Sequence, residues 1–479
     1  MNAPCRLSVN DVSKNPPDLA IIGAGSAGFA AAIRGAELGA RVVLIGAGTI
    51  GGTCVNIGCV PSKTLIRAVE TLQQARTASR FAGVRARGEL VDWRATVAQK
   101  DELVGELRRA KYIDLLPEYE NITYIEGRAR LTPQGISVDG TVLTPEKTII
   151  ATGASPAIPP IPGLDAVAWL TSTTALDLRE LPASLLVIGG GAIGCELGQM
   201  FARAGVEVTI VCRSRLLPTF EPELGAALAT YLRSEGIEVH CGVRYRTIRA
   251  DGGQVALDLE MPDGAIHTLT ARRLLVAAGR RPNTAGLNLD EVGVALTPGG
   301  GIEVDDHLRT TRAGTYAAGD VTGRDMFVYM AAYGAQVAAE NALNGDRRRY
   351  DASSMPQVVF TDPQVATVGL TQAQARERGL DVRTAILPLD RVPRAIAARD
   401  TRGLIKLVAE RASGRLLGAH VLAPEGGDSI QTAVLAVKHG LTVDDLAETI
   451  FPYLTTVEGL KLAALGFSKD VAKLSCCAS

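Results

Sequence analysis

Residues 51–63 have the sequence Gly-Gly-Thr-Cys-Val-Asn-Ile-Gly-Cys-Val-Pro-Ser-Lys, which places Cys54 and Cys59 five positions apart. On a regular helix, five residues rotate the chain about 140° beyond a full turn, so thiols at this spacing would face apart. Asn56 and Gly58 lie between them and allow the backbone to bend, so we predict that the thiols meet as a redox-active pair. Thiols at a helix start have a lowered pKa because the helix dipole favours the thiolate, and Lys63 adds a cation on the same face.

A strand, a glycine turn and a helix precede this stretch. Leu19–Ile22 is an apolar run typical of a buried parallel strand, and Arg41–Ile45 is the next strand after an Ala-rich helix. The glycines of the turn are Gly23, Gly25 and Gly28. This unit predicts a pyrophosphate bound at the helix N-terminus. The acid that usually binds the ribose is missing, because Gly46 stands in its place.

The same unit occurs a second time. Leu185–Ile188 and Val206–Val211 are the strands, and the glycines of the turn are Gly189, Gly191 and Gly194. Two such units predict two bound nucleotides, or one nucleotide and a decayed copy. Arg213 and Arg215 follow the second strand and favour a 2′-phosphate, hence NADPH over NADH. The alternative is that they are two surface arginines.

Length and composition limit the class of protein. With 479 residues the chain exceeds one ordinary core, and 47% hydrophobic and 21% charged residues indicate a globular protein. A net charge of -1 gives no general attraction to nucleic acid or acidic membranes. No segment approaches the roughly 18 apolar residues of a membrane span. The start lacks the apolar region of a secretory signal, so we expect a cytoplasmic protein without membrane insertion.

Eight cysteines in such a chain indicate thiol chemistry rather than a disulfide framework. Besides Cys54 and Cys59, two are adjacent at the C-terminus. The remaining four are scattered, and we expect them to be buried small hydrophobes or inert thiols: Cys5, Cys195, Cys212 and Cys241.

Residues 18–479 resemble the pyridine nucleotide–disulfide oxidoreductases, the family of glutathione reductase and lipoamide dehydrogenase. The stretch 51–63 resembles their redox-disulfide motif. Further motifs follow in order, at Thr148–Gly153, Leu274–Asn283, Thr310–Asp320 and Phe360–Gly369. The resemblance implies an α/β fold with two Rossmann-like dinucleotide-binding domains, for FAD and NADPH, and an α+β C-terminal dimerisation domain.

The resemblance also implies domain boundaries. A flexible tail covers residues 1–17, and the first part of the FAD-binding domain covers 18–153. The NADPH-binding domain follows at 154–280 and the second, central part of the FAD domain at 281–350. The dimerisation domain, with a C-terminal Cys-Cys tail, covers 351–479.

Residue roles follow from the same resemblance. Cys59 would lie against the flavin and Cys54 would be the exchanging thiol. Glu196 would lie near the nicotinamide and Asp320 would contact the ribityl chain, whereas Ala192 stands where the family often has a gating Tyr. The implied FAD-binding residues are Gly23, Gly25, Gly28, Gly48, Gly52, Thr53, Lys63, Ala129, Gly153, Asp320 and Val328. Those implied for NADPH are Gly189, Gly191, Gly194, Glu196, Arg213, Arg215 and Gly279.

The segment Phe451–Lys461 separates branches of this family. Disulfide-reducing members carry a His followed five residues later by a Glu, because the leaving thiolate needs a proton. This chain keeps Glu458 but has Tyr453 at the His position. A phenol with a pKa near 10 is a poor base at neutral pH, so a disulfide substrate is disfavoured.

The chain ends in Cys476-Cys477-Ala478-Ser479. Adjacent Cα atoms lie about 3.8 Å apart, below the roughly 4.4 Å that a disulfide usually needs, so the pair suits a soft metal ion. With the segment 451–461, this ending resembles the branch of the family that reduces mercuric ion. The resemblance implies reduction of Hg(II) to Hg(0) by NADPH through FAD and the Cys54/Cys59 pair, for mercury detoxification.

In that branch the enzyme is a homodimer with active sites shared between subunits. Cys476 and Cys477 would collect Hg(II) from its thiol complexes and pass it to Cys54 and Cys59, so all four cysteines are candidate metal ligands. Tyr453 and Tyr112 would line the metal site with Glu458 nearby, or the two tyrosines are packing residues. An N-terminal metal-binding domain, often present in the branch, has no counterpart, since only Cys5 precedes the core.

Two other functions stay open. A disulfide reductase of the high-molecular-weight thioredoxin reductase kind also ends in a redox pair, but it needs the His–Glu couple. A thiol protein that sequesters metal and uses its flavin only for sensing belongs to another class, and metal-dependent NADPH turnover would exclude it.

Overall fold

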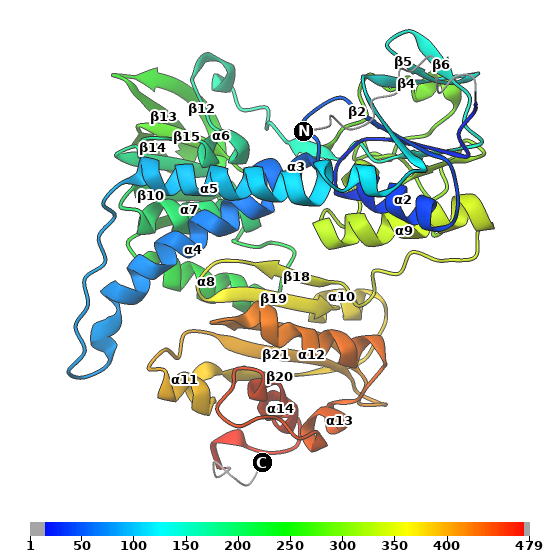
Figure 1. The fold of residues 1–479 in the computed structure, drawn as a ribbon. Helices are drawn as coiled ribbons and strands as arrows, with labels where there is room; N and C mark the ends of the chain where they lie inside the picture. The colour runs from blue at the N-terminus through cyan, green and yellow to red at the C-terminus, as the bar shows by residue number, and fades with distance from the viewer. Residues whose placement is uncertain (1–14, 474–479) are drawn as a thin grey trace. The chain divides into compact units, whose positions relative to one another are not determined.

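The computed structural model of the protein describes residues 15–473, which divide into two compact units (Figure 1). The first unit extends to Thr64 and continues over Arg94–Ala157 and Gly279–Ala352. The second unit comprises Leu65–Trp93, Ile158–Ala278 and the chain from Ser353 onward. Each unit contains one of the two glycine turns.

The first unit is built on a five-stranded parallel sheet. Its strands, in spatial order, are β17 (Thr315–Ala317), β7 (Lys147–Ile150), β1 (Leu19–Ile22), β2 (Val42–Gly46) and β3 (Ile122–Glu126). All residues of β1 and β2 are buried, because both faces of the sheet are covered. Helices α2 (Ser26–Glu37) and α9 (Val328–Asn344) run side by side in Figure 1 and pack together. Helix α2 contacts β1 and β7, and α9 contacts β7.

The opposite face of this sheet packs against a small antiparallel sheet. Its strands are β4 (Ala129–Thr132), β5 (Gly135–Val138) and β6 (Thr141–Leu143). Ile22 and Ile45 share one apolar cluster with Leu131 and Ile136. A further pair of strands, β8 (Ala154–Pro156) and β16 (Arg280–Pro282), joins the two long segments of the unit.

Two helices carry the cysteine motif, and a third is hydrogen bonded to it. They are α3 (Gly52–Ile57), α4 (Cys59–Arg76) and α5 (Trp93–Arg108). A single π-helical turn, η2 (Arg109–Ile113), follows α5 and carries Tyr112.

The second unit begins with a four-stranded parallel sheet. Its strands, in spatial order, are β11 (Glu238–Cys241), β10 (Glu207–Cys212), β9 (Ser184–Ile188) and β15 (Arg273–Val276). Helices α6 (Ser172–Leu176), α7 (Ala192–Arg203) and α8 (Pro222–Ser234) accompany it. An antiparallel sheet of β12 (Arg244–Asp251), β13 (Gln254–Glu260) and β14 (Ile266–Ala271) packs against β9 and β15.

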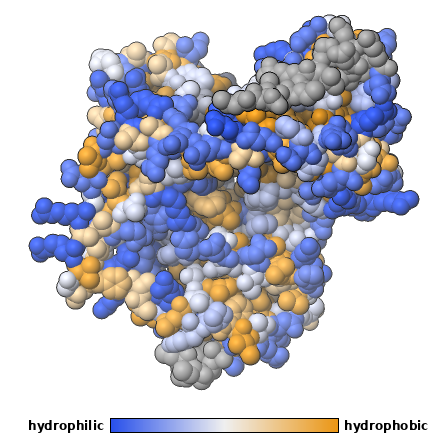
Figure 2. Space-filling model, in the orientation of Figure 1, coloured by the Kyte–Doolittle hydropathy of each residue, from blue (hydrophilic) through white to orange (hydrophobic). Residues whose placement is uncertain are grey.

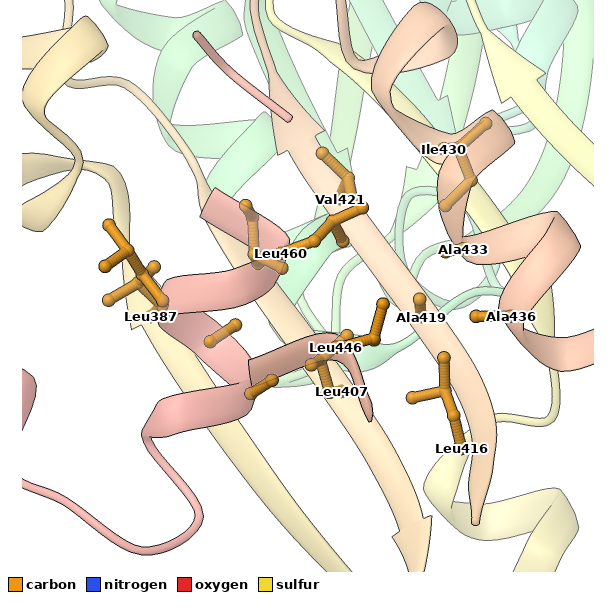
Figure 3. Packing of buried hydrophobic residues seen from close by; sticks show 14 of the residues in the cluster. Leu387, Leu407, Leu416, Ala419, Val421, Ile430, Ala433, Ala436, Leu446 and Leu460 are labelled. Carbon is orange, nitrogen blue, oxygen red and sulfur yellow. The ribbon is translucent and has the colours of Figure 1, made fainter. Parts of the chain in front are cut away.

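The C-terminal part is an antiparallel sheet covered by helices. Its strands, in order, are β18 (Pro356–Val359), β19 (Gln364–Gly369), β22 (Leu416–Ala423), β21 (Leu404–Glu410) and β20 (Val382–Pro388). Its helices are α10 (Gln372–Glu377), α11 (Pro393–Ala397), α12 (Gly426–Lys438), α13 (Val443–Glu448) and α14 (Glu458–Leu465). In Figure 3, Ile430 and Ala433 of α12 face Val421 of β22, while Leu446 and Leu460 lie against the same sheet.

The other face of this sheet carries a buried ionic cluster. Lys406 Nζ donates to Glu221 Oε2 and to Glu223 Oε1, each at 2.8 Å. His420 lies beside it, with Nε2 at 3.1 Å from the carbonyl of Leu370. Glu221 immediately precedes α8, so these bonds fasten the nucleotide-binding part of the unit to the C-terminal sheet. The pairing matters because an unpaired charge on buried Lys406 or Glu221 would strongly destabilise the fold.

The surface is mixed in character. The face drawn in Figure 2 carries hydrophilic and hydrophobic residues interspersed. Among residues 15–473, none of the helices combines the length and the apolar run that a membrane crossing requires.

Candidate active site

The helix that carries the cysteine pair is broken between the two thiols. Gly58 has φ -130° and ψ -109°, which ends α3 and lets α4 begin at Cys59. A Cβ at Gly58 would lie 2.9 Å from the carbonyl oxygen of Thr53, so only glycine fits the bend. The predicted bend between Cys54 and Cys59 is therefore present, and both cysteines are half-buried.

Asn56 holds this bend through its side chain. Nδ2 donates to the carbonyls of Ile50 and Gly52 at 2.9 and 2.8 Å, and Oδ1 accepts from Arg108 Nη1 at 3.2 Å. The sequence analysis treated Asn56 only as a residue that permits bending. The structure shows that its amide connects the loop before α3, the first turn of α3 and the end of α5.

The electrostatics of the pair differ from the sequence expectation. A hydrogen bond with Cys59 raises the pKa of Cys54, and burial raises it further, whereas Lys63 acts in the opposite direction. The prediction of a lowered pKa is thus wrong for Cys54. In the dithiol form Cys54 keeps its proton and donates it toward the sulfur of Cys59.

Tyr112 lies beside the pair. Its ring packs edge-on against Phe29, with ring centroids 4.9 Å apart, and its hydroxyl is hydrogen bonded to Ser26. Burial raises the pKa of Tyr112, and negative charge on Cys54 or Cys59 raises it further. The tyrosine therefore stays a neutral phenol at the edge of the thiol site.

The first glycine turn fits the pyrophosphate of FAD. A Cβ at Gly23 would lie 2.3 Å from the carbonyl oxygen of Ala151, and one at Gly28 would lie 1.7 Å from that of Gly23. Gly25 is the N-cap of α2 and has no side chain, so no capping side chain accepts hydrogen bonds from the N–H groups of the first turn. Gly52, at φ +65°, brings its Cα close to Gly25 and joins the cysteine motif to this turn. An uncapped helix N-terminus with close backbone approach suits an anion.

The second glycine turn repeats this geometry. A Cβ at Gly189 would lie 2.2 Å from the carbonyl oxygen of Ala277, and one at Gly194 would lie 2.0 Å from that of Gly189. Gly191 caps α7 without a side-chain hydrogen bond, and a Cβ there would meet nothing within 4 Å. Gly189 and Gly194 are therefore required for the same steric reasons as Gly23 and Gly28, and the second turn suits a second dinucleotide.

Gly46 has a steric explanation. A Cβ there would lie 2.8 Å from the hydroxyl oxygen of Tyr124 and 2.8 Å from Cβ of Ala24. Tyr124 thus occupies the space where the usual acid would begin. Glu126 is the direct strand partner of Gly46 and is the nearest acid in register.

The other residues implied for FAD are distributed around the first unit. Gly153 has φ +73°, and Asn283 donates from its backbone to Gly153 and from its side chain to the carbonyl of Thr152. Asp320 is 3.7 Å from Arg280, and burial raises the pKa of its carboxyl. The remaining residues occupy an exposed loop (Gly48), the exposed side of α3 (Thr53), α4 (Lys63), the start of β4 (Ala129) and the start of α9 (Val328).

Glu196 is fixed to the C-terminal part of its unit. Its Oε1 accepts from the backbone N–H of Phe360 at 2.9 Å, and Gln199, one turn further along α7, exchanges two hydrogen bonds with the backbone of Asp362. Arg203 continues the same helix face and binds Asp362 Oδ2 at 2.9 Å. The motif at Phe360 is visible in the sequence, but this attachment is not, because it depends on tertiary packing.

The two arginines implied for the 2′-phosphate have different surroundings. The guanidinium of Arg215 donates to the carbonyls of Leu217, Pro218 and Phe220 at 3.0, 2.8 and 2.7 Å. Arg213 is exposed at the end of β10. Arg215 therefore braces its own loop, a role that the sequence did not predict. Gly279, with φ +117°, lies outside this nucleotide-binding part, at the start of a segment of the first unit.

Tyr453 lies in the turn before α14, and Glu458 is the first residue of that helix. Glu458 is buried, and its Oε2 accepts from the backbone N–H of Leu454 at 3.1 Å. Leu454 has φ +59°, so the carboxylate fixes a strained turn that holds Tyr453 50% exposed. Burial raises the pKa of Glu458. Cys476 and Cys477 lie outside the described residues.

Comparison with known proteins agrees with this arrangement. Residues 17–339 match the family model of the pyridine nucleotide-disulphide oxidoreductases, and residues 355–464 match that of their dimerisation domain. The chain belongs to the pyridine nucleotide-disulphide oxidoreductase family, and the predicted fold class is confirmed.

Its relatives narrow the class. The chain is 49% identical over 467 residues to a mercuric reductase of Streptomyces lividans, covering 96% of this chain and 98% of that protein. It is 46% identical to a mercuric reductase of Bacillus cereus, covering 98% and 75%. Among solved structures, it matches the HOCl-induced flavoprotein disulfide reductase RclA from Escherichia coli, as a Cu(II) complex, with 32% identity, TM-score 0.83 and coverage of 95% and 100%. LpdA from Mycobacterium tuberculosis matches with 28% identity, TM-score 0.83 and coverage of 94% and 99%.

Proposed function

We propose that the protein reduces Hg(II) to Hg(0) with NADPH, using FAD and the Cys54/Cys59 pair. The observation that carries the proposal is the substitution at the C-terminal motif. Glu458 is retained and braces the turn, but the side chain that it positions is Tyr453 rather than a base. A disulfide substrate needs a proton for its leaving thiolate, whereas reduction of a metal ion does not. The mercuric reductases named above support the same assignment.

The chain's own residues would divide the work as follows. The glycine turns at Gly23–Gly28 and Gly189–Gly194 bind the pyrophosphates of FAD and NADPH, which when bound supply hydride and electron transfer. Cys54 and Cys59 hold Hg(II) as a dithiolate, with the bend at Gly58 keeping their sulfurs together. Tyr112, a neutral phenol beside them, limits the room at the metal. Two electrons reach Hg(II), and the thiolates are released unchanged.

The dimer and the tail complete the proposal. The chain carries the dimerisation domain of its family, and we infer a homodimer in which active sites are shared between subunits. Hg(II) would arrive as complexes with small thiols in the cytoplasm, where thiols are kept reduced. Cys476 and Cys477 would take Hg(II) from these complexes, and Tyr453 would line its path.

The test is a substrate comparison with the purified holoenzyme. NADPH oxidation should require Hg(II) in the presence of excess small thiol, and volatile mercury should form in equal amount. Glutathione disulfide, lipoamide and thioredoxin should support turnover at least a hundredfold more slowly. Faster turnover with a disulfide would favour a thioredoxin reductase-like enzyme, and Hg(II) binding without NADPH oxidation would favour a sequestering protein.

A further inference from the structure

A second thiol pair lies in the nucleotide-binding part of the second unit. Cys212 ends β10 and Cys241 ends β11, and the two residues are direct partners in the parallel register. Their Sγ atoms are 3.4 Å apart, and both cysteines are free. The sequence predicts that these scattered cysteines are buried small hydrophobes or inert thiols; Cys212 is buried, but the sequence does not indicate that the two thiols are neighbours. Their pairing depends on strand register and is not visible from a spacing of 29 residues.

The pair adjoins the second glycine turn. A Cβ at Gly190 would lie 2.9 Å from Cβ and 3.0 Å from Sγ of Cys212, so the thiol packs directly against the turn. The backbone N–H of Leu217 donates to the carbonyl of Gly190 at 2.7 Å, which ties the following loop to the same glycine. Arg213, proposed for the 2′-phosphate, is the next residue after Cys212. A group that enlarges this thiol site would press on the proposed NADPH site.

The two thiols are not equivalent. A hydrogen bond with Cys241 and burial raise the pKa of Cys212. The same hydrogen bond lowers the pKa of Cys241 to about 6, with help from the backbone N–H of Leu216 and the charge of Arg233. Cys241 is half-buried and Cys212 is buried. Cys241 is therefore the more acidic and the more exposed of the two thiols.

We propose that Cys212 and Cys241 form a second binding site for a soft thiophilic metal ion, Hg(II), and that an ion bound there weakens NADPH binding. Among residues 15–473 there is no group of three or more His, Cys, Asp or Glu side chains able to hold a metal, which disfavours an ion such as zinc that takes four ligands. Two sulfurs alone suit a soft ion of low coordination number. The proposal rests on the proposed function only in naming Hg(II) as the ion that this protein meets.

Loading would proceed by ligand exchange. The Cys241 thiolate attacks Hg(II) held by two small thiolates and displaces the first. Cys212 then displaces the second, and its proton leaves with a carrier thiol, so no electrons are transferred. With metal–sulfur bonds of about 2.3 Å, as in zinc thiolates, a linear complex places the sulfurs roughly 4.6 Å apart. The sulfurs must therefore separate, which pushes Cys212 against Gly190.

The site is tested by stoichiometry without turnover. The FAD-loaded enzyme, with Cys54 and Cys59 oxidised and with Cys5→Ala, Cys476→Ala and Cys477→Ala, is mixed with Hg(II) and a slight excess of cysteine. After gel filtration, about one Hg(II) per FAD is expected, with none bound after Cys212→Ser and Cys241→Ser. Saturating NADP+ should prevent loading, and loading should raise the Kd for NADP+ at least fivefold. The matched control, Cys195→Ser, changes a buried cysteine that donates to the carbonyl of Gly190, and it should leave loading intact.

Other results would overturn this proposal or the proposed function, and the two cases can be told apart. Equal Hg(II) in the parent and the double variant would place the ion elsewhere, and an unchanged Kd for NADP+ would remove the coupling. If the double variant fails to retain FAD, Cys241→Ser alone, at the half-buried position, replaces it, and this variant should bind no Hg(II). An enzyme that loads Hg(II) here but never reduces it would contradict the proposed function alone. An enzyme that reduces Hg(II) but loads none here would contradict this proposal alone.

Discussion

The amide of Asn56 accepts a hydrogen bond from the guanidinium of Arg108, with Oδ1 and Nη1 3.2 Å apart, at the bend between Cys54 and Cys59. Its Nδ2 donates to two backbone carbonyls on the other side. Three bonds from one side chain thus fix the segment that carries Cys54 and Cys59. The geometry of the thiols therefore depends on the side chain of Asn56.

Asn56→Ala should therefore impair catalysis more than stability. Three lost hydrogen bonds, at about 1 kcal/mol each, lower the free energy of unfolding by about 2–3 kcal/mol. Hg(II)-dependent NADPH oxidation per bound FAD should fall at least tenfold, because the thiols no longer hold one geometry. The control is Asn121→Ala in the same unit. It removes two hydrogen bonds from the Asn121 side chain to backbone carbonyls and should lower the thermal midpoint but not turnover. Equal turnover losses in both variants would mean that Asn56→Ala acts through a general loss of stability rather than through the thiol geometry.

Cys54 and Cys59, the proposed redox pair, should respond differently to substitution by serine. Cys59→Ser should abolish long-wavelength thiolate–flavin absorbance in the two-electron-reduced enzyme while FAD stays bound. Cys54→Ser should keep that absorbance, because Cys59 remains, but lose turnover. The reverse pattern in the absorbance spectra would exchange the two roles, and normal Hg(II) turnover in both variants would remove the pair from the mechanism.

Arg213→Ala should reduce the preference for NADPH over NADH. A charge-assisted hydrogen bond to phosphate contributes about 1.5–3 kcal/mol, so kcat/KM for NADPH should fall about 10- to 100-fold with NADH unaffected. Arg215→Ala is the matched control: it breaks three bonds to carbonyls of its own loop and should lower the thermal midpoint with the preference retained. Steady-state kinetics with both nucleotides decide the matter. A preference that survives Arg213→Ala but not Arg215→Ala would reverse the assignment.

The parts of the site that could be predicted from the sequence are those set by local geometry. Gly28 and Gly194 are required because a side chain there would collide with the carbonyl five positions earlier in the same turn, and this local constraint is visible in the sequence as a glycine motif. The bend at Gly58 is local in the same way. Features that depend on packing of distant segments leave no such trace. The Cys212–Cys241 pair and the Lys406–Glu221 bond join residues 29 and 185 positions apart.

Predictions from residue type alone also failed where a neighbouring group of the protein determines what the side chain does. Arg215 has the same charge and nearly the same position as Arg213, yet three carbonyls of its own loop engage its guanidinium. For Cys54, the effect of a helix start is outweighed by the shared proton of the thiol pair and by burial.

His420 should make stability depend on pH. Burial lowers its pKa to about 4, despite the facing carboxylates of Glu221 and Glu223, and Lys406 lowers it further. The unfolded chain binds a proton near pH 6.5 and the folded chain does not, so stability is full above 6.5 and falls as the pH drops toward about 4. The loss reaches on the order of 3 kcal/mol. His420→Gln should flatten urea-unfolding midpoints between pH 7 and 5, while His439→Gln, at an exposed position, should not. Equal slopes in all three proteins would contradict the burial argument.

The tail prediction concerns how Hg(II) reaches the site. Cells present Hg(II) already bound to thiols, so transfer proceeds by attack of a protein thiolate on the metal, and two adjacent thiolates gain from a high effective concentration once the first has bound. Cys476→Ala with Cys477→Ala should therefore abolish turnover of Hg(II) carried by bulky thiols. Turnover with small carriers, which reach Cys54 and Cys59 directly, should fall less than tenfold. Flavin reduction by NADPH should be unchanged in stopped-flow measurements.

Heterodimers test whether the tail serves its own subunit. A subunit with Cys476→Ala and Cys477→Ala, paired with one that carries Cys54→Ala and Cys59→Ala, has one intact tail and one intact redox pair on different chains. If the site is built across the dimer, this pairing should regain turnover of bulky Hg(II) complexes to about half of the wild-type rate per FAD. The control pairing places both intact elements on one chain opposite a chain lacking both, and it should stay inactive with bulky carriers. Activity in the control but not in the test pairing would show that the tail acts within its own subunit.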